Sequence, residues 1–224
     1  MSYHESIDFS KDSHFRSMEL SGLKYFPWIG KSFFEKTERI LIVGESVYNW
    51  GKNEVEKKKA DEMLSNSTFA RFVAFNHGLQ SDNPKHRFTR NLEKTIHGKN
   101  FEHQDEKVNF WKMVSFHEFV QRPMRDRKER PSKEDYKIAA RILLELINEL
   151  KITKCIFSGT DWNKFSHIEQ AIKSKSITHF SEKLNGTHPK IIQIKNDINT
   201  KVYFIKHPSS FFSWQKWKVF ISEN

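Results

Sequence analysis

The sequence predicts an α/β protein in which a parallel sheet carries helices on both faces. Three short apolar runs, at 39–43, 154–157 and Lys201–Ile205, have the β-branched composition of strands that are buried on both sides. Weaker strands are expected at 111–119 and Lys190–Ile194. A long helical pattern lies between the first two strong strands, and this strand–helix–strand order is typical of a parallel sheet.

The clearest helix is expected over residues 132–150. Ser132 can cap its first turn, and Asp135 stands three residues later, which is the arrangement of a capping box. A second helix is expected over 53–64. The apolar residues of the first helix recur at helical spacing, at Ile138, Ile142, Leu143, Leu146, Ile147 and Leu150.

Length and charge narrow the class of protein. The 224 residues are expected to form one domain over 1–224, with an N-terminal extension at 1–20. The hydrophobic content of 37% and aromatic content of 14% exclude a disordered chain or a coiled coil. Lys and Arg number 38 against 28 Asp and Glu, so the net charge is +10, which favours a polyanionic partner such as DNA.

Cysteine usage and hydropathy indicate the environment of the chain. Cys155 is the only cysteine, which excludes an internal disulfide, a cysteine-based zinc site and an iron–sulfur cluster. We therefore expect no metal and no cofactor. No signal peptide and no apolar stretch of membrane length is recognisable. The protein is expected to be cytoplasmic, although a nuclear location also fits. We expect it to be a monomer and not to bind membranes.

Distinctive residues follow the strands, where sites form in parallel α/β sheets. The first strand leads into 44–51 (GESVYNWG), and the last leads into 207–214 (HPSSFFSW). Between them come the aromatic segment 110–121 and the strand end 156–159. In this order, over about residues 20–222, the chain resembles the uracil-DNA glycosylase superfamily.

The resemblance implies a three-layer α/β/α sandwich around a four-stranded parallel sheet. It also implies a monofunctional DNA glycosylase, which flips a nucleotide out of the DNA and hydrolyses its N-glycosidic bond. His207 matches the family histidine that stabilises negative charge at O2 of the departing base. Ser209 is expected to cap the following helix or to bind a phosphate there.

The first motif departs from the family. Where the most active uracil enzymes carry an Asp that orients the water, this chain has Ser46, while Tyr48 matches the aromatic beside C5 of the base. Glu45 matches an acidic residue of other subgroups. Glu45, Ser46 or Asn49 could hold the water, and we favour Glu45 because a carboxylate can accept a proton and steady a sugar cation.

The middle strand departs further. Related segments have an aromatic followed by an Asn that reads uracil, whereas this chain has His117 and Glu118. An ionised carboxylate only accepts hydrogen bonds, so it suits N4–H₂ of cytosine and repels O4 of uracil. A Glu protonated by burial could instead donate to N3 of cytosine.

These departures predict a glycosylase for a modified cytosine. Excision of plain cytosine would destroy the host genome, so a C5 modification is expected, such as the hydroxymethyl or glucosyl groups of phage DNA. A defence role follows as a hypothesis. Two alternatives remain: a repair glycosylase for uracil or deaminated bases, and an inactive DNA-binding module of the same fold.

The remaining expectations concern the base and the duplex. Phe75 is expected to stack on the flipped base, and Phe211 or Phe212 to fill the space that the base leaves. The basic loop 121–130 is expected to contact DNA or a polar substituent. The DNA-binding residues expected are Ser209, Ser210, Phe211, Phe212, Arg122, Arg125 and Arg127.

Overall fold

The sheet is wider than the sequence indicates. The structure, a computed structural model, describes residues 2–81 and 83–224. Its strands, within these residues, form one mixed sheet in the order β1-β3-β2-β4-β7-β6-β5. They are β1 (Trp28–Ile29), β2 (Ile40–Gly44), β3 (Val114–Glu118), β4 (Lys154–Ser158), β5 (Lys175–His179), β6 (Lys190–Ile194) and β7 (Lys201–Ile205).

The expectation of a four-stranded parallel sheet is corrected at the edges. The central strands β3, β2, β4 and β7 are parallel, while β1, β6 and β5 pair antiparallel. The β1 strand is only two residues long, and β5 is mostly exposed, so neither has the apolar run of a buried strand. The strand expected at 111–119 starts at Val114, because its first residues complete a helix.

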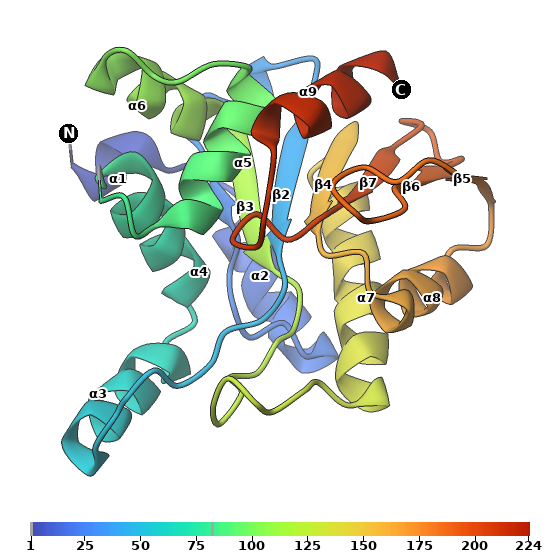
Figure 1. Cartoon of the computed structure of the whole chain (residues 1–224). Coiled ribbons are helices and arrows are strands. Elements are labelled where there is room, and N and C mark those ends of the chain that lie inside the picture. Colours follow the sequence, from blue (N-terminus) through green and yellow to red (C-terminus); the bar gives the residue numbers. More distant parts are fainter. Residues whose placement is uncertain (1, 82) are drawn as a thin grey trace.

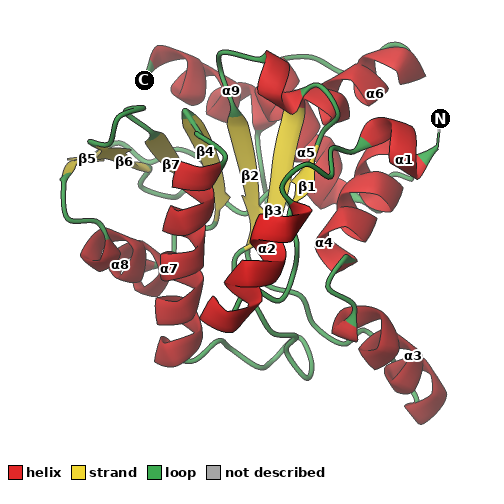
Figure 2. Cartoon of the chain, turned by 180° about the vertical axis from the view of Figure 1, so that it is seen from behind, coloured by secondary structure: helices red, strands yellow, loops and turns green. Residues whose placement is uncertain are grey.

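Helices cover both faces of the sheet (Figures 1 and 2). The helix expected at 132–150 is confirmed: Ser132 accepts a hydrogen bond from the backbone of Asp135, and the capping box is complete. The α3 helix projects from the body in both views. The helices are α1 (Tyr3–Ser6), α2 (Asp12–Met18), α3 (Glu54–Ser65), α4 (Phe69–Phe72), α5 (Arg87–His97), α6 (Gln104–Met113), α7 (Lys133–Glu149), α8 (Trp162–Ala171) and α9 (Trp214–Glu223), with short 3₁₀ turns η1 (Glu19–Ser21) and η2 (Phe33–Glu35) and the π-helix η3 (Val73–Leu79).

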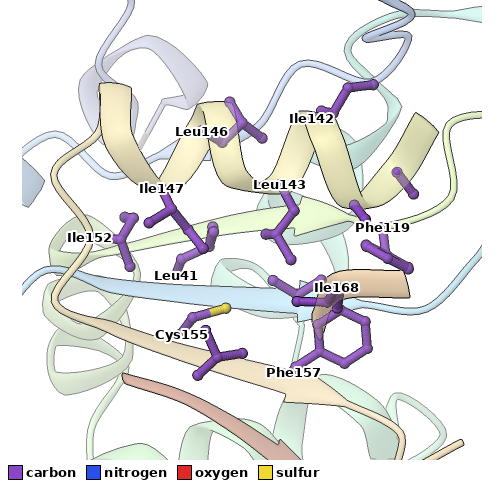
Figure 3. Packing of buried hydrophobic residues seen from close by; sticks show 14 of the residues in the cluster. Leu41, Phe119, Ile142, Leu143, Leu146, Ile147, Ile152, Cys155, Phe157 and Ile168 are labelled. Carbon is purple, nitrogen blue, oxygen red and sulfur yellow. The ribbon is translucent and has the colours of Figure 1, made fainter. Parts of the chain in front are cut away.

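Strand alternation divides the core into two layers. On β2, Leu41 and Val43 belong to the cluster that contains residues of α2, α7 and α8, whereas Ile42 belongs to the cluster with α4, α5, α6 and α9. Figure 3 shows α7 lying over the sheet, with its apolar side chains above Leu41, Cys155 and Phe157. Each such side chain contributes about 1.5–3 kcal/mol through burial.

The segment expected as an N-terminal extension packs against this body. Phe15 and Met18 of α2 lie inside the first core cluster. Asp12 accepts a hydrogen bond from Nη1 of the buried Arg71 at 3.0 Å. Residues 2–20 therefore contribute to the core. In the described part of the chain, no helix combines the length and apolar character that crossing a bilayer requires.

Candidate active site

A pocket of about 840 Å³ lies at the carboxyl ends of β2 and β3 and beside the loop that follows β7. This volume falls in the range of about 300–1,000 Å³ that is usual for small-molecule sites. The pocket brings together seven of the residues expected from the sequence: Glu45, Ser46, Tyr48, Glu118, Arg127, His207 and Ser209.

Strand register decides the position of Glu118. In the parallel pairing of β2 with β3, Gly44 is the partner of Glu118. A Cβ at position 44 would lie 2.4 Å from Oε2 of Glu118, so the glycine leaves the space that this carboxyl occupies. Glu118 lies on the same face of β3 as Phe116, whose ring contacts Phe88 of the pocket wall at 6.2 Å.

The Glu118 carboxyl is buried without a hydrogen-bond donor. Only 6% of the residue is exposed, and no described residue donates a hydrogen bond to its carboxyl oxygens. Burial, with a further contribution from the charge of Glu45, raises the pKa of Glu118 to about 8. Glu118 is therefore mainly protonated at pH 7, with one donor and one acceptor facing the pocket.

The neighbouring residue, His117, does not reach the pocket. Alternate residues of a strand face opposite sides, so His117 and Glu118 cannot share one site. His117 is fully buried, and its Nε2 lies 3.2 Å from the amide nitrogen of Gln121. Burial lowers the pKa of His117 to about 3, which keeps the ring neutral. The expectation that His117 contacts the base is corrected.

A buried lysine, which the sequence reasoning missed, accompanies Glu45. Nζ of Lys164 lies 2.6 Å from Oε1 of Glu45, and only 4% of the lysine side chain is exposed. Lys164 lies in the first turn of α8, more than a hundred residues from Glu45 in the chain. Local sequence carries no signal of this contact, because the two residues meet only through the packing of α8 against the loop after β2.

His207 follows β7 and lines the pocket with its ring at 5.4 Å from that of Phe88. Nδ1 of His207 accepts a hydrogen bond from the backbone N–H of Ser209 at 3.3 Å. The other ring nitrogen, Nε2, therefore carries the proton when the ring is neutral. Burial lowers the pKa of His207, while Glu45 raises it and Lys164 lowers it. The neutral ring is a hydrogen-bond donor.

Tyr48 and Arg127 form one side of the pocket. The guanidinium of Arg127 lies 5.2 Å from the centre of the Tyr48 ring, at cation–π distance. Backbone hydrogen bonds from Val120 to Glu45 and from Met124 to Val47 join the two loops beyond the strands. The pairing of these loops sets the position of the first motif relative to the basic loop.

The aromatic wall differs from the expected one. Phe75 packs against Tyr3 and Trp28, at 5.3 and 6.4 Å between ring centres, and does not line the pocket. The wall contains Phe72 and Phe88 instead. Phe72 ends α4 and Phe88 lies in α5, with the π-helix η3 between them, so spacing along one helix could not predict this wall.

Two histidines complete this wall. His77, on the π-helix, and His86, just before α5, stack with ring centres 4.2 Å apart. Burial lowers the pKa of both residues, and their mutual repulsion lowers that of His77 further. Both rings are therefore neutral, flat surfaces that line the pocket.

Several residues of the two motifs have structural partners outside the pocket. The Asn49 amide donates hydrogen bonds to the backbone of Lys57 and to Asp61, at 2.9 and 2.7 Å. Phe212 stacks on Trp217 at 6.1 Å. The expectation that Asn49 holds the water is corrected, because its side chain is held away from the pocket, whereas Phe212 lines the neighbouring groove beside Phe211.

The end of the second motif exposes one aromatic ring. Phe211 is 94% exposed and has a φ of +42°, which is unusual for a residue with a side chain. Ser209 does not cap the last helix, which starts at Trp214 with Ser213 in the N-cap position. Ser209 lines the pocket, and Ser210 lies beside Phe211 in a neighbouring groove of about 600 Å³.

Two arginines of the basic loop are paired with acidic residues. Arg122 makes two hydrogen bonds of 2.8 Å with Asp135 and one of 2.9 Å with Glu129. Arg125 is 88% exposed and pairs with Glu129 at 3.2 Å. Of the three arginines expected to bind DNA, only Arg127 lines the pocket.

Two other arginines lie closer to the exposed ring. Arg87 and Arg90 of α5 line the groove that contains Ser210 and Phe211. Within residues 2–81 and 83–224, neither arginine has a salt-bridge partner. The sequence reasoning missed them, because α5 lies far along the chain from the second motif.

Comparisons with known proteins leave the site to be interpreted from its own chemistry. No family model matches the chain. A search of curated proteins gives no match either. Among the described residues, no group of three or more His, Cys, Asp or Glu side chains is arranged to hold a metal ion.

Proposed function

We propose that this protein is a DNA glycosylase that takes a flipped, C5-modified cytosine into the pocket and hydrolyses its N-glycosidic bond, leaving an abasic site. The observation that carries the proposal is the protonated, unpartnered carboxyl of Glu118 in the same pocket as His207. The four central parallel strands and the two helical layers support a uracil-DNA glycosylase-like arrangement.

Glu118 matches the pairing edge of cytosine. Its O–H can donate to N3 while its carbonyl oxygen accepts from N4–H₂. Cytosine is a poor leaving group, and a proton delivered to N3 lets it depart as a neutral base. The carboxylate that remains on Glu118 then accepts hydrogen bonds from both N3–H and N4–H₂.

The other pocket residues serve the sugar and O2. The neutral His207 ring can donate from Nε2 to O2 of the base, where electron density accumulates as the bond breaks. Glu45 can hold the attacking water and stabilise the positive charge on the sugar. The N-glycosidic bond then breaks, water attacks the sugar and its proton passes to the Glu45 carboxylate, and these steps need no cofactor.

The size of the pocket supports a modified base. Beyond Tyr48, the pocket continues to Trp50, Lys59, Met63 and Arg127, so it holds more than a pyrimidine ring. The aromatic rings and charged groups suit a hydroxymethyl or glucosyl group at C5. Such groups occur in phage DNA, and an enzyme that requires them would spare host cytosine, which supports a defence role.

The groove beside the pocket supports contact with a DNA strand. Phe211 is exposed next to the pocket and can enter the space that a flipped base leaves. Arg87 and Arg90 can bind the phosphates on either side of that space.

Uracil is a second candidate substrate, and one observation favours keeping it. The expected repulsion between Glu118 and O4 of uracil requires an ionised carboxyl, whereas Glu118 is protonated at pH 7. With its proton on the other oxygen, the carboxyl can donate to O4 and accept from N3–H. The two bases differ in chemistry, since only cytosine needs the proton of Glu118 in order to leave as a neutral base.

Released bases measured by mass spectrometry test the proposal. Purified protein is incubated with duplex and single-stranded DNAs that contain uracil, cytosine, 5-hydroxymethylcytosine or glucosylated hydroxymethylcytosine. We expect release of a C5-modified cytosine and none of plain cytosine, with His207→Ala as the inactive control. Release of uracil alone would make the repair function the correct one, and tight DNA binding without release would indicate an inactive module.

A further inference from the structure

A buried ammonium group lies directly behind the pocket. Nζ of Lys164 contacts Oε1 of Glu45 at 2.6 Å, and the lysine side chain is almost completely shielded from solvent. A buried charge is costly unless it is closely paired, so the ammonium group of Lys164 holds the Glu45 carboxyl in one place. Lys164 is not among the residues that line the pocket, which argues that it acts through Glu45.

The chain around Lys164 accommodates this ion pair. Gly159, in the connection from β4 to α8, has a φ of +113°, a conformation that residues with side chains rarely adopt. A Cβ at this position would lie 2.8 Å from Nζ of Lys164 and 3.8 Å from Oε2 of Glu45. Asp161 caps the following helix by accepting a hydrogen bond from the backbone of Asn163 at 2.9 Å. The connection therefore leaves room for the ammonium group.

The two pocket carboxyls are electrostatically coupled. The charge of Glu45 contributes to the raised pKa of Glu118 and also raises the pKa of His207. The Glu45 side chain is 29% exposed and Glu118 is buried, so the cost of placing a second negative charge beside the first falls on Glu118. Only Glu45 has a cation against it.

We propose that Lys164 is a positioning residue that decides which of the two pocket carboxyls carries the proton, by pairing with Glu45 and leaving the proton on Glu118. The meaning of this division for catalysis rests on the proposed function: Glu45 serves the water and the sugar cation, and Glu118 protonates the base. The division itself is a property of the protein without DNA.

Other titratable groups face these carboxyls and enter the test. Tyr25 is an electrostatic neighbour of Glu118, and His117 precedes Glu118 on β3. Tyr136 of α7 and His207 are electrostatic neighbours of Glu45. Tyr136 and His117 are neutral at pH 7, because burial raises the pKa of the first to about 12 and lowers that of the second to about 3.

Carboxyl NMR tests the division directly. Protein labelled with ¹³C at the glutamate carboxyl carbon is titrated from pH 4 to pH 9, and the two signals are assigned with Glu45→Gln and Glu118→Gln. We expect Glu118 to titrate near pH 8 in the wild type. In Lys164→Met, the Glu118 signal should show less protonation at pH 7, because Glu45 without its cation competes for the proton. In Lys164→Arg, the wild-type titration of Glu118 should return.

A matched control and a second variant keep the test decisive. Lys154→Met removes another 2.6 Å ion pair, with Glu38, at the opposite end of β4, and should leave the titration of Glu118 unchanged. If Lys164→Met does not fold, the double variant Lys164→Met/Glu45→Gln is used, since it removes both charges of the ion pair together. Glu118 should then titrate lower than in the wild type. An unchanged midpoint in the variant that is measured overturns the proposal.

Activity supplies a separate readout. Base release at pH 7 should fall in Lys164→Met, because Glu45 without its cation competes with Glu118 for the proton, and Lys164→Arg should restore it. Reduction with borohydride during turnover should trap no protein–DNA adduct, whereas an adduct that needs Lys164 would make the lysine a nucleophile and overturn its positioning role. If the wild type releases no base, the proposed function fails, and the NMR titration still decides the proton division.

Discussion

Glu118→Gln is the perturbation that tests the chemistry of the pocket most directly. Glutamine preserves the shape of the side chain and can orient its amide toward the pairing edge of either cytosine or uracil. It cannot deliver a proton to N3. We therefore expect the variant to lose excision of modified cytosine and to retain or gain excision of uracil, which leaves without that proton.

The magnitude follows from the raised pKa of Glu118, about 8. With this pKa, about nine tenths of the molecules are protonated at pH 7 and about one tenth at pH 9. The single-turnover rate on modified cytosine should then fall about tenfold between these two pH values. The variant has no such titration. At pH 7 its rate should be lower by about 10²–10⁴-fold, the usual contribution of a general acid, because the amide can pair with cytosine but cannot protonate N3.

The assay compares single-turnover rates on modified cytosine and on uracil, from pH 6 to pH 9, for the wild type and Glu118→Gln. Glu134→Gln, an exposed change on α7, is the control and should match the wild type. The reasoning is refuted if the wild type removes uracil fastest and the ratio of the two rates does not move in the variant. A wild-type rate that is flat to pH 9 also contradicts it.

The same carboxyl affects stability in a direction that can be measured. The pKa of Glu118 is higher in the folded protein than in the unfolded chain, so the folded state binds more protons between about pH 4.5 and pH 8. The free energy of unfolding contributed by this group therefore falls as the pH rises through that window. Glu118→Gln should gain stability relative to the wild type from pH 5 to pH 8, by on the order of a few kcal/mol, as measured by denaturant unfolding. An unchanged difference would mean that Glu118 ionises normally.

Three further predictions concern the pocket and its rim. His207→Ala should lower the rate of base release by about 10²–10³-fold in a single-turnover assay, and an unchanged rate would remove His207 from the chemistry. Gly44→Ala places a Cβ in the space of the base-reading carboxyl and should reduce activity more than stability, whereas equal activity would mean that this carboxyl is free to move. Replacement of Arg87 and Arg90 by Ser should weaken DNA binding and reduce the slope of log K against log salt by about one per phosphate contact. Arg125→Ser removes a charge that is already paired, so it should have less effect. The opposite order would mean that the basic loop binds the duplex.

Elements that depend on local pattern could be predicted from the order of residues alone. The β7 and β6 strands occupy the expected residues, and α7 begins at the expected capping box. Apolar runs and caps act over a few residues, so their effect can be read without the rest of the chain. The placement of chemical groups after the strands was predictable for the same reason, since parallel strands bring their carboxyl ends to one edge.

The number of strands in the sheet and the pairing of charged residues depend on the tertiary structure. The edge strands β1 and β5 are too short or too polar to be recognised, and they form because a neighbouring strand offers unpaired backbone groups. The basic loop illustrates the limit for charge: Arg122 counts as a cation in the sequence, yet Asp135 and Glu129 neutralise it in the fold.

The pocket itself depends on contacts between distant residues. Glu118 faces the base only because β3 pairs with β2 in the register that sets it beside Gly44, and a shift of one residue would turn His117 there instead. Lys164 contacts Glu45 although the two residues lie far apart in the chain. Phe72, at the end of α4, lines the pocket, whereas Phe75 of the π-helix does not. Sequence spacing carries no information about such contacts, because register, burial and pairing are properties of the packed chain as a whole.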